Sequence, residues 1–437
     1  MNPYDLILYI YENYFLYILI SILFFFLLYF LFKSQILSFY DPIIFFICFT
    51  FGTSYAVVVL LFIGGIIATK YFVLIFSSFI FLLLGSYLGF YSKKINFGMR
   101  RLDLYLNEIS IKILLNFLII FYFLLLLYYI YNVNFTLFFI SRFEANKGFG
   151  HLVRIMEVIR CFVIASLTIF LFKGGNKILK SITLLIFILV SSLVTGAKFA
   201  ILESIYLAII TYMLFYGKFI KLQLKSILSG LVILLLVVFS SLFFSNRLAE
   251  SMDYSSQYTK YNPAVEMLLS RVIANGDMYY LGLSNLVLDK VVDKDSSFIE
   301  LIARPYLGSG VTDNIFNNNG RETITIGRAI WEYWYPNSLS GGSTDHFDLA
   351  AYSYFGYIGG SFFVFYLGFI LGRINKMKIN LYNTNKQNFT SIVFFALIYS
   401  KIYQLLLSPV VGVVALIDIF LIFLILIVFS KLFRHEA

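Results

Sequence analysis

Runs of about twenty apolar residues recur along this chain, and they restrict its fold more than any other feature. A helix of that length crosses the roughly 30 Å hydrocarbon core of a membrane. Of the 437 residues, 61% are hydrophobic and 13% are charged, whereas soluble proteins carry roughly 25% charged residues. The sequence therefore predicts an all-α polytopic membrane protein, because a helix in lipid satisfies its own backbone hydrogen bonds.

The apolar runs predict about eleven transmembrane helices, with ten or twelve also compatible. About eight lie in residues 1–245 and about three in residues 349–437, which end in a short tail. In order, the expected spans are Tyr14–Phe32, two within Ile43–Tyr91, Ile111–Tyr131, one from His151 to before Lys173, Ile182–Leu193, Phe199–Phe215, Ile227–Phe244, Leu349–Leu371, Phe389–Leu407 and Val410–Phe429.

Basic residues predict the orientation of these spans. Cytoplasmic loops of membrane proteins carry an excess of lysine and arginine. Here every second loop is basic, with clusters at Lys93–Arg101, Lys173–Lys180, Lys218–Lys225 and Arg373–Lys386. This alternation places the C-terminus in the cytoplasm and residues 246–348 outside.

One long polar segment, residues 246–348, interrupts the apolar pattern. Its acidic residues outnumber its basic ones, so it is not a cationic surface for nucleic acid. Pro263–Arg271 and Gly276–Leu288 have helical patterning. Tyr306–Ser343 is rich in Gly, Asn, Thr and Ser and is expected to be an ordered loop of functional importance.

Four arginines lie in segments expected outside, where positive charge is disfavoured. They are Arg142, Arg304, Arg321 and Arg328. An arginine binds phosphate oxygens bidentately, so these are candidate phosphate ligands. Each could instead form a salt bridge with a neighbouring carboxylate, as Arg142 could with Glu144.

A second candidate group precedes the ninth span, in the sequence Thr344-Asp345-His346-Phe347-Asp348. Asp345 or His346 could act as a general base at the membrane surface. An acidic residue at a helix N-terminus also stabilises the helix dipole, so Asp348 could simply be a cap.

A third group lies inside the fifth span, where Arg154, Glu157 and Arg160 share one helix face. Charged residues within a span usually pair with one another or face a cavity, and both explanations stay open. Weaker examples of the same kind are Lys198, Glu203, Lys401 and Asp418.

Several other chemistries are excluded. There is no P-loop, dinucleotide fingerprint or zinc-protease pattern, so we expect no cofactor and no metal. Asp293-Lys294-Asp295 matches the Asp-x-Asp pattern of enzymes that use nucleotide sugars, but it lies in the segment expected outside and lacks a soluble α/β domain around it.

Three stretches resemble the bacterial O-antigen polymerases of the Wzy type and, more distantly, the O-antigen ligases. They are Arg142, Arg304–Gly320, and the passage from Asp345 to Tyr354-Phe355-Gly356-Tyr357-Ile358-Gly359-Gly360. The overall topology is similar as well. In one departure, the position of the ligase histidine, counted back from Gly356, falls on Asp345.

The resemblance implies a GT-C-type membrane glycosyltransferase. Such an enzyme moves a growing glycan from undecaprenyl diphosphate to the non-reducing end of a new lipid-linked unit. It implies that Arg142, Arg304, Arg321 and Arg328 bind the diphosphate and that Asp345, His346 or Asp348 serves the acceptor. Rings that could stack on sugars are Tyr306, Trp331 and Trp334.

The resemblance also implies partners, and two alternative functions stay open. The expected partners are the undecaprenyl diphosphate-linked oligosaccharide, membrane lipid and a chain-length regulator, with no nucleic acid. The rivals are an O-antigen ligase and a flippase for the lipid-linked oligosaccharide. Transporters often contain internal repeats, and we find none in this sequence.

Overall fold

The structure is a computed structural model, and 88% of the residues that it describes are helical, with no strand among them. These residues are 1–93, 108–133, 148–172, 177–195, 200–217, 263–292, 297–316, 324–338, 342–383 and 389–432. Together with the long apolar helices, this confirms an all-α polytopic membrane protein.

The N-terminal part forms long helices that follow the apolar runs. They are α1 (Pro3–Glu12), α2 (Tyr14–Phe32), the short 3-10 helix η1 (Lys33–Gln35), the π-helix η2 (Ile44–Phe49), α3 (Thr50–Ile63), α4 (Thr69–Tyr91), α5 (Glu108–Asn132), α8 (Gly150–Phe172), α9 (Lys177–Thr195) and α10 (Ala200–Tyr216).

The remaining part begins with short helices and ends with long ones. They are α12 (Pro263–Ile273), η4 (Ala274–Gly276), α13 (Asp277–Leu283), η5 (Ser284–Leu286), α14 (Val287–Val291), α15 (Phe298–Leu307), α16 (Ser309–Ile315), α17 (Ile326–Trp334), α18 (Phe347–Asn383), α19 (Phe389–Lys401), α20 (Gln404–Leu407) and α21 (Pro409–Leu432).

Seven helical stretches of the described chain are long and apolar enough to cross a membrane. They contain α2, α3, α4, α5, α18, α19 with α20, and α21. The apolar helices α9 and α10 are shorter, and α8 contains the charged row of the fifth predicted span. The predicted span Ile227–Phe244 lies outside the described residues, so the total of eleven stays a prediction.

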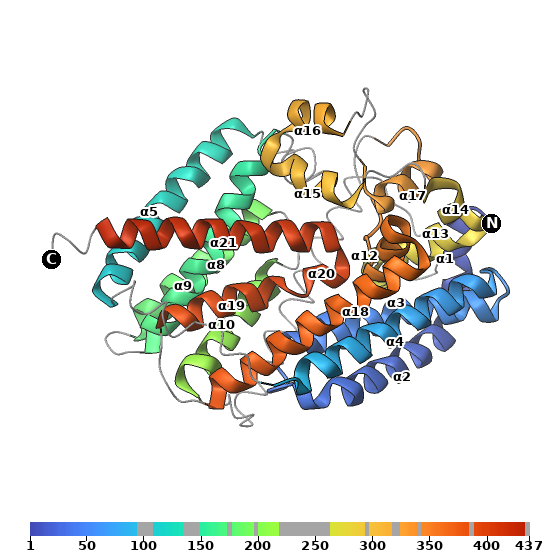
Figure 1. Ribbon diagram of the computed structural model, residues 1–437, viewed down its shortest axis with the longest axis horizontal. Coiled ribbons are helices and arrows are strands. Elements are labelled where there is room, and N and C mark those ends of the chain that lie inside the picture. Colours follow the sequence, from blue (N-terminus) through green and yellow to red (C-terminus); the bar gives the residue numbers. More distant parts are fainter. Residues whose placement is uncertain are drawn as a thin grey trace.

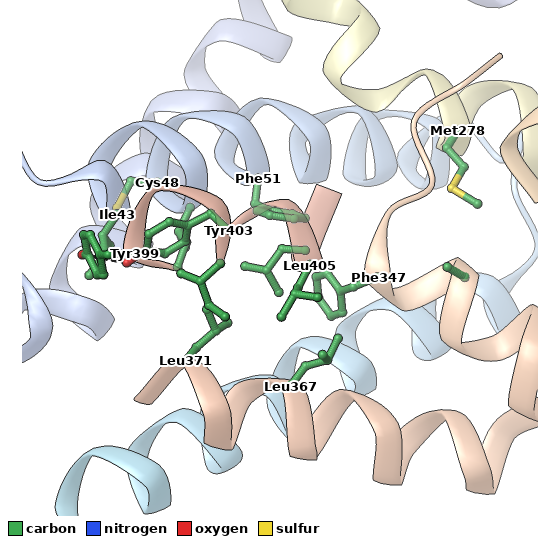
Figure 2. Packing of buried hydrophobic residues seen from close by; sticks show 14 of the residues in the cluster. Ile43, Cys48, Phe51, Met278, Phe347, Leu367, Leu371, Tyr399, Tyr403 and Leu405 are labelled. Atoms are coloured by element: carbon green, nitrogen blue, oxygen red, sulfur yellow. Dashed lines mark hydrogen bonds between the residues drawn. The ribbon is translucent and has the colours of Figure 1, made fainter. Parts of the chain in front are cut away.

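The long helices form two groups that lie side by side (Figure 1). One contains α2, α3, α4 and α18, and the other contains α5, α8, α9, α10, α19 and α21. Within the first group α3 is the central helix, since 11 of its 14 residues are buried. Figure 2 shows its Phe51 beside Leu405 and Phe347, which come from the second half of the chain.

Glycines let α4 and α18 pack with their backbones almost in contact. Gly85 and Gly89 on α4 face Gly368 and Gly372 on α18. A Cβ atom at any of the four would lie 2.0 to 2.2 Å from a carbonyl oxygen of the other helix. The two Gly-x-x-x-Gly patterns are therefore the sequence signal for this contact, which the predicted spans alone did not reveal.

A glycine also divides α18. Gly356 has φ +67° and ψ −170°, a conformation that is essentially restricted to glycine. The first turns of α18 therefore run separately from the long segment that packs on α4. The break lies in the Tyr354–Gly360 passage that carried the family resemblance.

The polar segment contains more helix than expected. The loop predicted over Tyr306–Ser343 was wrong in part, because α16 and α17 lie within it. Thr325 caps α17 by accepting a hydrogen bond from Arg328 N at 3.3 Å, and Ile326, Ala329 and Ile330 form its buried stripe. Polar and glycine-rich flanks had hidden this short stripe in the sequence.

The helix predicted over Gly276–Leu288 is likewise three short pieces, α13, η5 and α14. Asn285 and Leu286 both have positive φ and interrupt it. Upstream of it, Asn275 in η4 bonds to α3: Ser54 Oγ donates to Asn275 O at 2.8 Å, and Asn275 Nδ2 donates to Thr53 Oγ1 at 2.9 Å. The polar segment is thus anchored on the central helix.

Candidate functional site

The helix α15 connects the two groups of long helices. Ser297 Oγ caps its start by accepting a hydrogen bond from Glu300 N at 3.3 Å. The ring of Phe298 packs against Phe355 and Phe363 of α18, with centroids 5.5 and 5.4 Å away. The other end of α15 contacts α21. Near the top of the view in Figure 1, α15 and α16 lie over one end of the bundle.

An ion pair holds the far end of α15. Arg154 of α8 binds Asp418 of α21 bidentately, with Nε–Oδ2 at 2.8 Å and Nη2–Oδ1 at 2.6 Å. Arg154 Nη1 also donates to the carbonyl of Pro305 at 3.1 Å. Tyr306 donates to Asp418 Oδ1 at 3.0 Å, and its ring lies 4.6 Å from the Arg154 guanidinium. The guanidinium of Arg154 and the hydroxyl of Tyr306 therefore already have partners within the protein.

Arg304, two residues before Tyr306, is different. Its guanidinium lies 3.7 Å from Asp313 of α16, and its side chain is 31% exposed. Among the described residues it has no hydrogen-bond partner, and its Nη1 is a buried donor left unsatisfied. Nε and Nη2 of this partly exposed guanidinium also make no hydrogen bond to a described residue, and a charge-assisted bidentate bond to an oxyanion would engage them. Of the predicted phosphate ligands that the structure describes, Arg304 is the one with free donors.

Arg328 is already bound within its own helix region. Its Nε donates to Glu332 Oε1 at 2.6 Å, and its Nη2 donates to the carbonyl of Ser338 at 2.6 Å. These bonds hold the end of α17 to the turn that follows it. The geometry favours a salt bridge for Arg328, one of the two explanations that the sequence left open.

The two tryptophans of α17 are half-buried and pack against the core. Trp331 Nε1 donates to Ser338 Oγ at 3.2 Å, and Trp334 Nε1 donates to Leu281 O at 2.9 Å. Trp331 also lies against Tyr335, with ring centroids 4.6 Å apart. Both indole N–H groups are thus hydrogen-bonded within the protein. Only the partly exposed surfaces of the rings are left to contact a glycan.

Asp345 caps α17. It is 8% exposed, and its Oδ1 accepts a hydrogen bond from Gly327 N at 2.5 Å. Gly327 has no side chain to block this approach, since a Cβ there would lie 2.5 Å from the same oxygen. Ser408 Oγ donates to Oδ2 at 3.4 Å. Burial raises the pKa of Asp345 to about 6, although these donors oppose the shift.

His346 and Asp348 meet at one tyrosine. Tyr279 of α13 donates its proton to Asp348 Oδ2 at 2.7 Å, and its oxygen lies 3.2 Å from His346 Nδ1. Because the one hydroxyl proton goes to Asp348, Nδ1 of His346 carries the proton that completes this chain. Burial lowers the pKa of His346 to about 4, so the ring is neutral at pH 7. Both side chains are 0% exposed.

A further carboxylate, Asp277, lies at the start of α13. We call Asp277, Asp345, His346 and Asp348 together the acid–histidine cluster. Asp277 Oδ1 accepts hydrogen bonds from Thr344 N at 3.0 Å, Thr344 Oγ1 at 2.6 Å and Met278 N at 2.7 Å. All three bonds from described residues go to Oδ1. Asp277 is half-buried rather than enclosed, and burial raises its pKa to about 6.

A short stretch at the start of α21 connects the acid–histidine cluster with the Arg154–Asp418 contact at the end of α15. Ser408, which bonds to Asp345, directly precedes this helix, and the carbonyl of Val414 accepts a hydrogen bond from Tyr306 at 3.0 Å. Six residues of helix span about 9 Å. The carboxylates and the arginine end of α15 are therefore at the same end of the bundle.

Inside the second helix group, four charges form a compact cluster. Arg160 Nη2 donates to Glu157 at 2.5 Å and to Glu203 of α10 at 3.1 Å. Lys401 of α19 donates to the same two carboxylates at 2.6 and 2.7 Å. This result confirms ion pairing for the charged row of α8, and the weaker examples Glu203, Lys401 and Asp418 prove to be the partners.

Some predicted residues lie outside the described part of the chain. They are Arg142, Arg321, Lys198 and the Asp293-Lys294-Asp295 triplet. Within the described part, no group of three or more His, Cys, Asp or Glu side chains is arranged to hold a metal ion.

Comparison with known proteins finds no matching family model, no matching curated protein and no matching solved structure. The class that the fold defines is therefore an all-helical membrane protein with a helical polar segment at one end of its bundle.

The sequence did not single out Asp277 or Tyr279. Tyr279 lies 67 residues before His346, and no spacing rule links positions so far apart. A better signal existed for Asp277, since it directly follows Asn-Gly at the start of a helical pattern.

Proposed function

We propose that this protein is a membrane glycosyltransferase that polymerises lipid-linked oligosaccharide repeat units on the outer face of a bacterial inner membrane. It transfers the growing glycan from undecaprenyl diphosphate to the non-reducing end of a new lipid-linked unit. The observation that carries the proposal is Arg304, a partly exposed arginine without a hydrogen-bond partner among the described residues. The resemblance to O-antigen polymerases supports it.

The chemistry explains why such an arginine is needed. The bond between the sugar carbon and the diphosphate oxygen breaks, and the diphosphate leaves with the electron pair. Preorganised donors aimed at that developing charge stabilise the transition state. The neighbouring Tyr306 and the Arg154–Asp418 pair hold α15 rigidly, so Arg304 is presented on a fixed helix.

The acceptor hydroxyl forms the new bond to the sugar carbon and gives up its proton. In this proposal the acid–histidine cluster provides the acceptor side. Asp345, His346 and Asp348 shape it from inside, while Asp277 is the carboxylate with an oxygen free to accept the proton. A carboxyl group whose pKa is close to 6 suits proton transfer near neutral pH. The reaction needs no cofactor, and a chain-length regulator is a further proposed partner.

Deletion of the gene tests the proposal, with surface polysaccharide analysed by gel electrophoresis. A polymerase predicts lipid cores that carry a single repeat unit. Naked cores with polymer left on the carrier would identify a ligase, and loss of outward-facing precursor would identify a flippase.

Arg304→Ala should reduce long-chain glycan by about 100-fold or more, the loss typical when one transition-state donor is removed. The loose ion pair with Asp313 is worth little to folding, so protein levels should stay normal. Lys290→Ala, a change at another basic residue of the polar segment, is the control and should keep full chain length. Unchanged glycan in Arg304→Ala would refute the role of Arg304.

A flippase is the second candidate, and the four-charge cluster inside the bundle favours it. Ionisable residues within membrane spans often mark a substrate path. In a flippase, Lys401→Met would block the appearance of precursor on the outer surface when it is compared with the wild type at equal levels of folded protein. In a polymerase, precursor would still appear there as single units.

A further inference from the structure

Another group of cations lies at the end of the bundle where α4 terminates. The apolar span ends at Tyr91, so Ser92 and Lys93 lie at the membrane boundary. Close packing through the glycines brings α18 alongside: a Cβ at Gly89 would lie 3.1 Å from the backbone nitrogen of Arg373. Arg373 and Lys376 therefore meet Ser92 and Lys93, the two residues that directly follow α4.

The contacts at this end are specific. Arg373 Nη1 donates to Ser92 Oγ at 2.5 Å and to Lys93 O at 2.7 Å. Lys376 Nζ donates to Ser92 O at 2.9 Å. Cations commonly bind the last carbonyls of a helix in this way. These bonds fix the two side chains but use only part of their donors.

The unused donors have the geometry that phosphate prefers. Nε and Nη2 of Arg373 make no bond to any described residue, and together they form the side of the guanidinium that binds an oxyanion bidentately. Lys376 keeps further protons, and Lys93 is exposed beside them. Arg373 and Lys376 thus lie together with open donors, and the backbone of the third basic residue, Lys93, contacts Arg373.

No carboxylate of the described chain pairs with these three residues. Lys378, five residues after Arg373 on the same helix, differs, because it is fully buried and pairs with Asp41 at 2.6 Å. A lysine nearby therefore has an acidic partner from the protein, whereas Arg373, Lys376 and Lys93 do not. Their charge is complementary to an external anion.

We infer that Arg373, Lys376 and Lys93 bind the phosphate of an anionic phospholipid at the end of α4. The apolar surfaces of α4 and α18 beside the site, including exposed Leu88 and Tyr366, would contact the acyl chains. Juxtamembrane basic residues attract anionic lipid headgroups in this way. The inference is independent of the proposed glycosyltransferase activity.

Native mass spectrometry of the purified full-length protein tests the inference. Micelles containing equal amounts of phosphatidylglycerol and phosphatidylcholine supply the lipids, and the bound molecules of each are counted. The wild type should retain phosphatidylglycerol selectively. Arg373→Gln with Lys376→Gln should weaken that retention by roughly 25-fold, about fivefold for each charge removed.

Lys180→Gln is the matched control. Lys180 also donates to a helix carbonyl, that of Phe170 at 2.8 Å, so its loss removes one charge and one similar bond elsewhere. Selectivity that falls equally in this control and in the double variant would overturn the site. So would a wild type without selectivity. If inorganic phosphate protects the protein from heat as well as phosphatidylglycerol does, the site binds free phosphate and the lipid assignment is wrong.

Arg373→Lys decides the case in which the double variant does not fold. It keeps the charge but removes the bidentate side of the guanidinium. We expect at least a twofold loss of phosphatidylglycerol retention, roughly what loss of one hydrogen bond produces. Full retention in this variant would contradict the proposed binding mode.

Discussion

At the scale of single residues, Asp345 is where a functional pattern and a structural role coincide. Its carboxylate accepts the backbone N–H of Gly327 at the start of α17, where the helix dipole favours negative charge. Burial acts in the opposite direction and raises the pKa of Asp345 to about 6. The balance between these effects can be measured.

Asp345→Asn should be more stable than the wild type near neutral pH. A folded-state pKa raised from about 4 to about 6 means that this group stabilises the fold fully below pH 4 and loses that contribution as the pH rises through 6. The difference amounts to about 3 kcal/mol, and Asn can still accept the Gly327 N–H.

Thermal unfolding in detergent from about pH 4 to pH 8 checks this. The advantage of Asp345→Asn should vanish at the acidic end. The charge of Asp345 also raises the pKa of Asp277, so its removal lowers the pKa of Asp277 and adds to the advantage of the variant at neutral pH. A variant that is less stable at neutral pH would mean that the dipole of α17 outweighs burial.

At the scale of helices, the sequence predicted long elements well and short ones poorly. The first span was expected at Tyr14–Phe32 and is observed over the same residues, because a continuous apolar run has only one helical solution in lipid. The helix α17 was missed, since its nine residues contain too few turns for a clear period. Its stability comes from packing and from the caps at Thr325 and Asp345.

The α4–α18 contact gives a prediction at this scale. Gly368→Ala should destabilise the protein by about 1–3 kcal/mol, since the new methyl group would overlap a carbonyl of α4 and force the helices apart. Gly150→Ala is the control, because a Cβ there meets nothing within 4 Å. Equal melting temperatures for the two variants in the same detergent would refute close packing through these glycines.

At the scale of the whole molecule, the end of α19 and the turn before α20 connect the two helix groups. Tyr399 donates to Asp41 at 2.6 Å, and Tyr403 donates to Asn375 at 3.1 Å, both in or next to the first group. Lys401, between them, binds α8 and α10 of the second group. Residues two apart on a helix point in nearly opposite directions, so Lys401 faces the second group while Tyr399 faces the first.

Lys401→Met should therefore destabilise the entire protein by about 3–5 kcal/mol, the usual result of removing one partner from a buried ion pair. Adding Glu203→Gln restores the charge balance with Arg160 and Glu157 and should recover part of the loss. Unfolding in a single detergent can compare the three proteins. If the second change lowers stability further, the cluster does not depend on charge neutrality.

The sequence by itself determined the membrane class, the long helices and the segment that holds the polar residues. Apolar length and charge are local properties, and lipid leaves the backbone few alternatives. The tertiary structure decided which polar groups are already paired. Arg328, Arg154 and Asp345 are bound to partners that are distant or locally folded, whereas Arg304 is left with free donors. Pairing depends on distances between segments far apart in the chain, and no pattern of neighbouring residues contains that information.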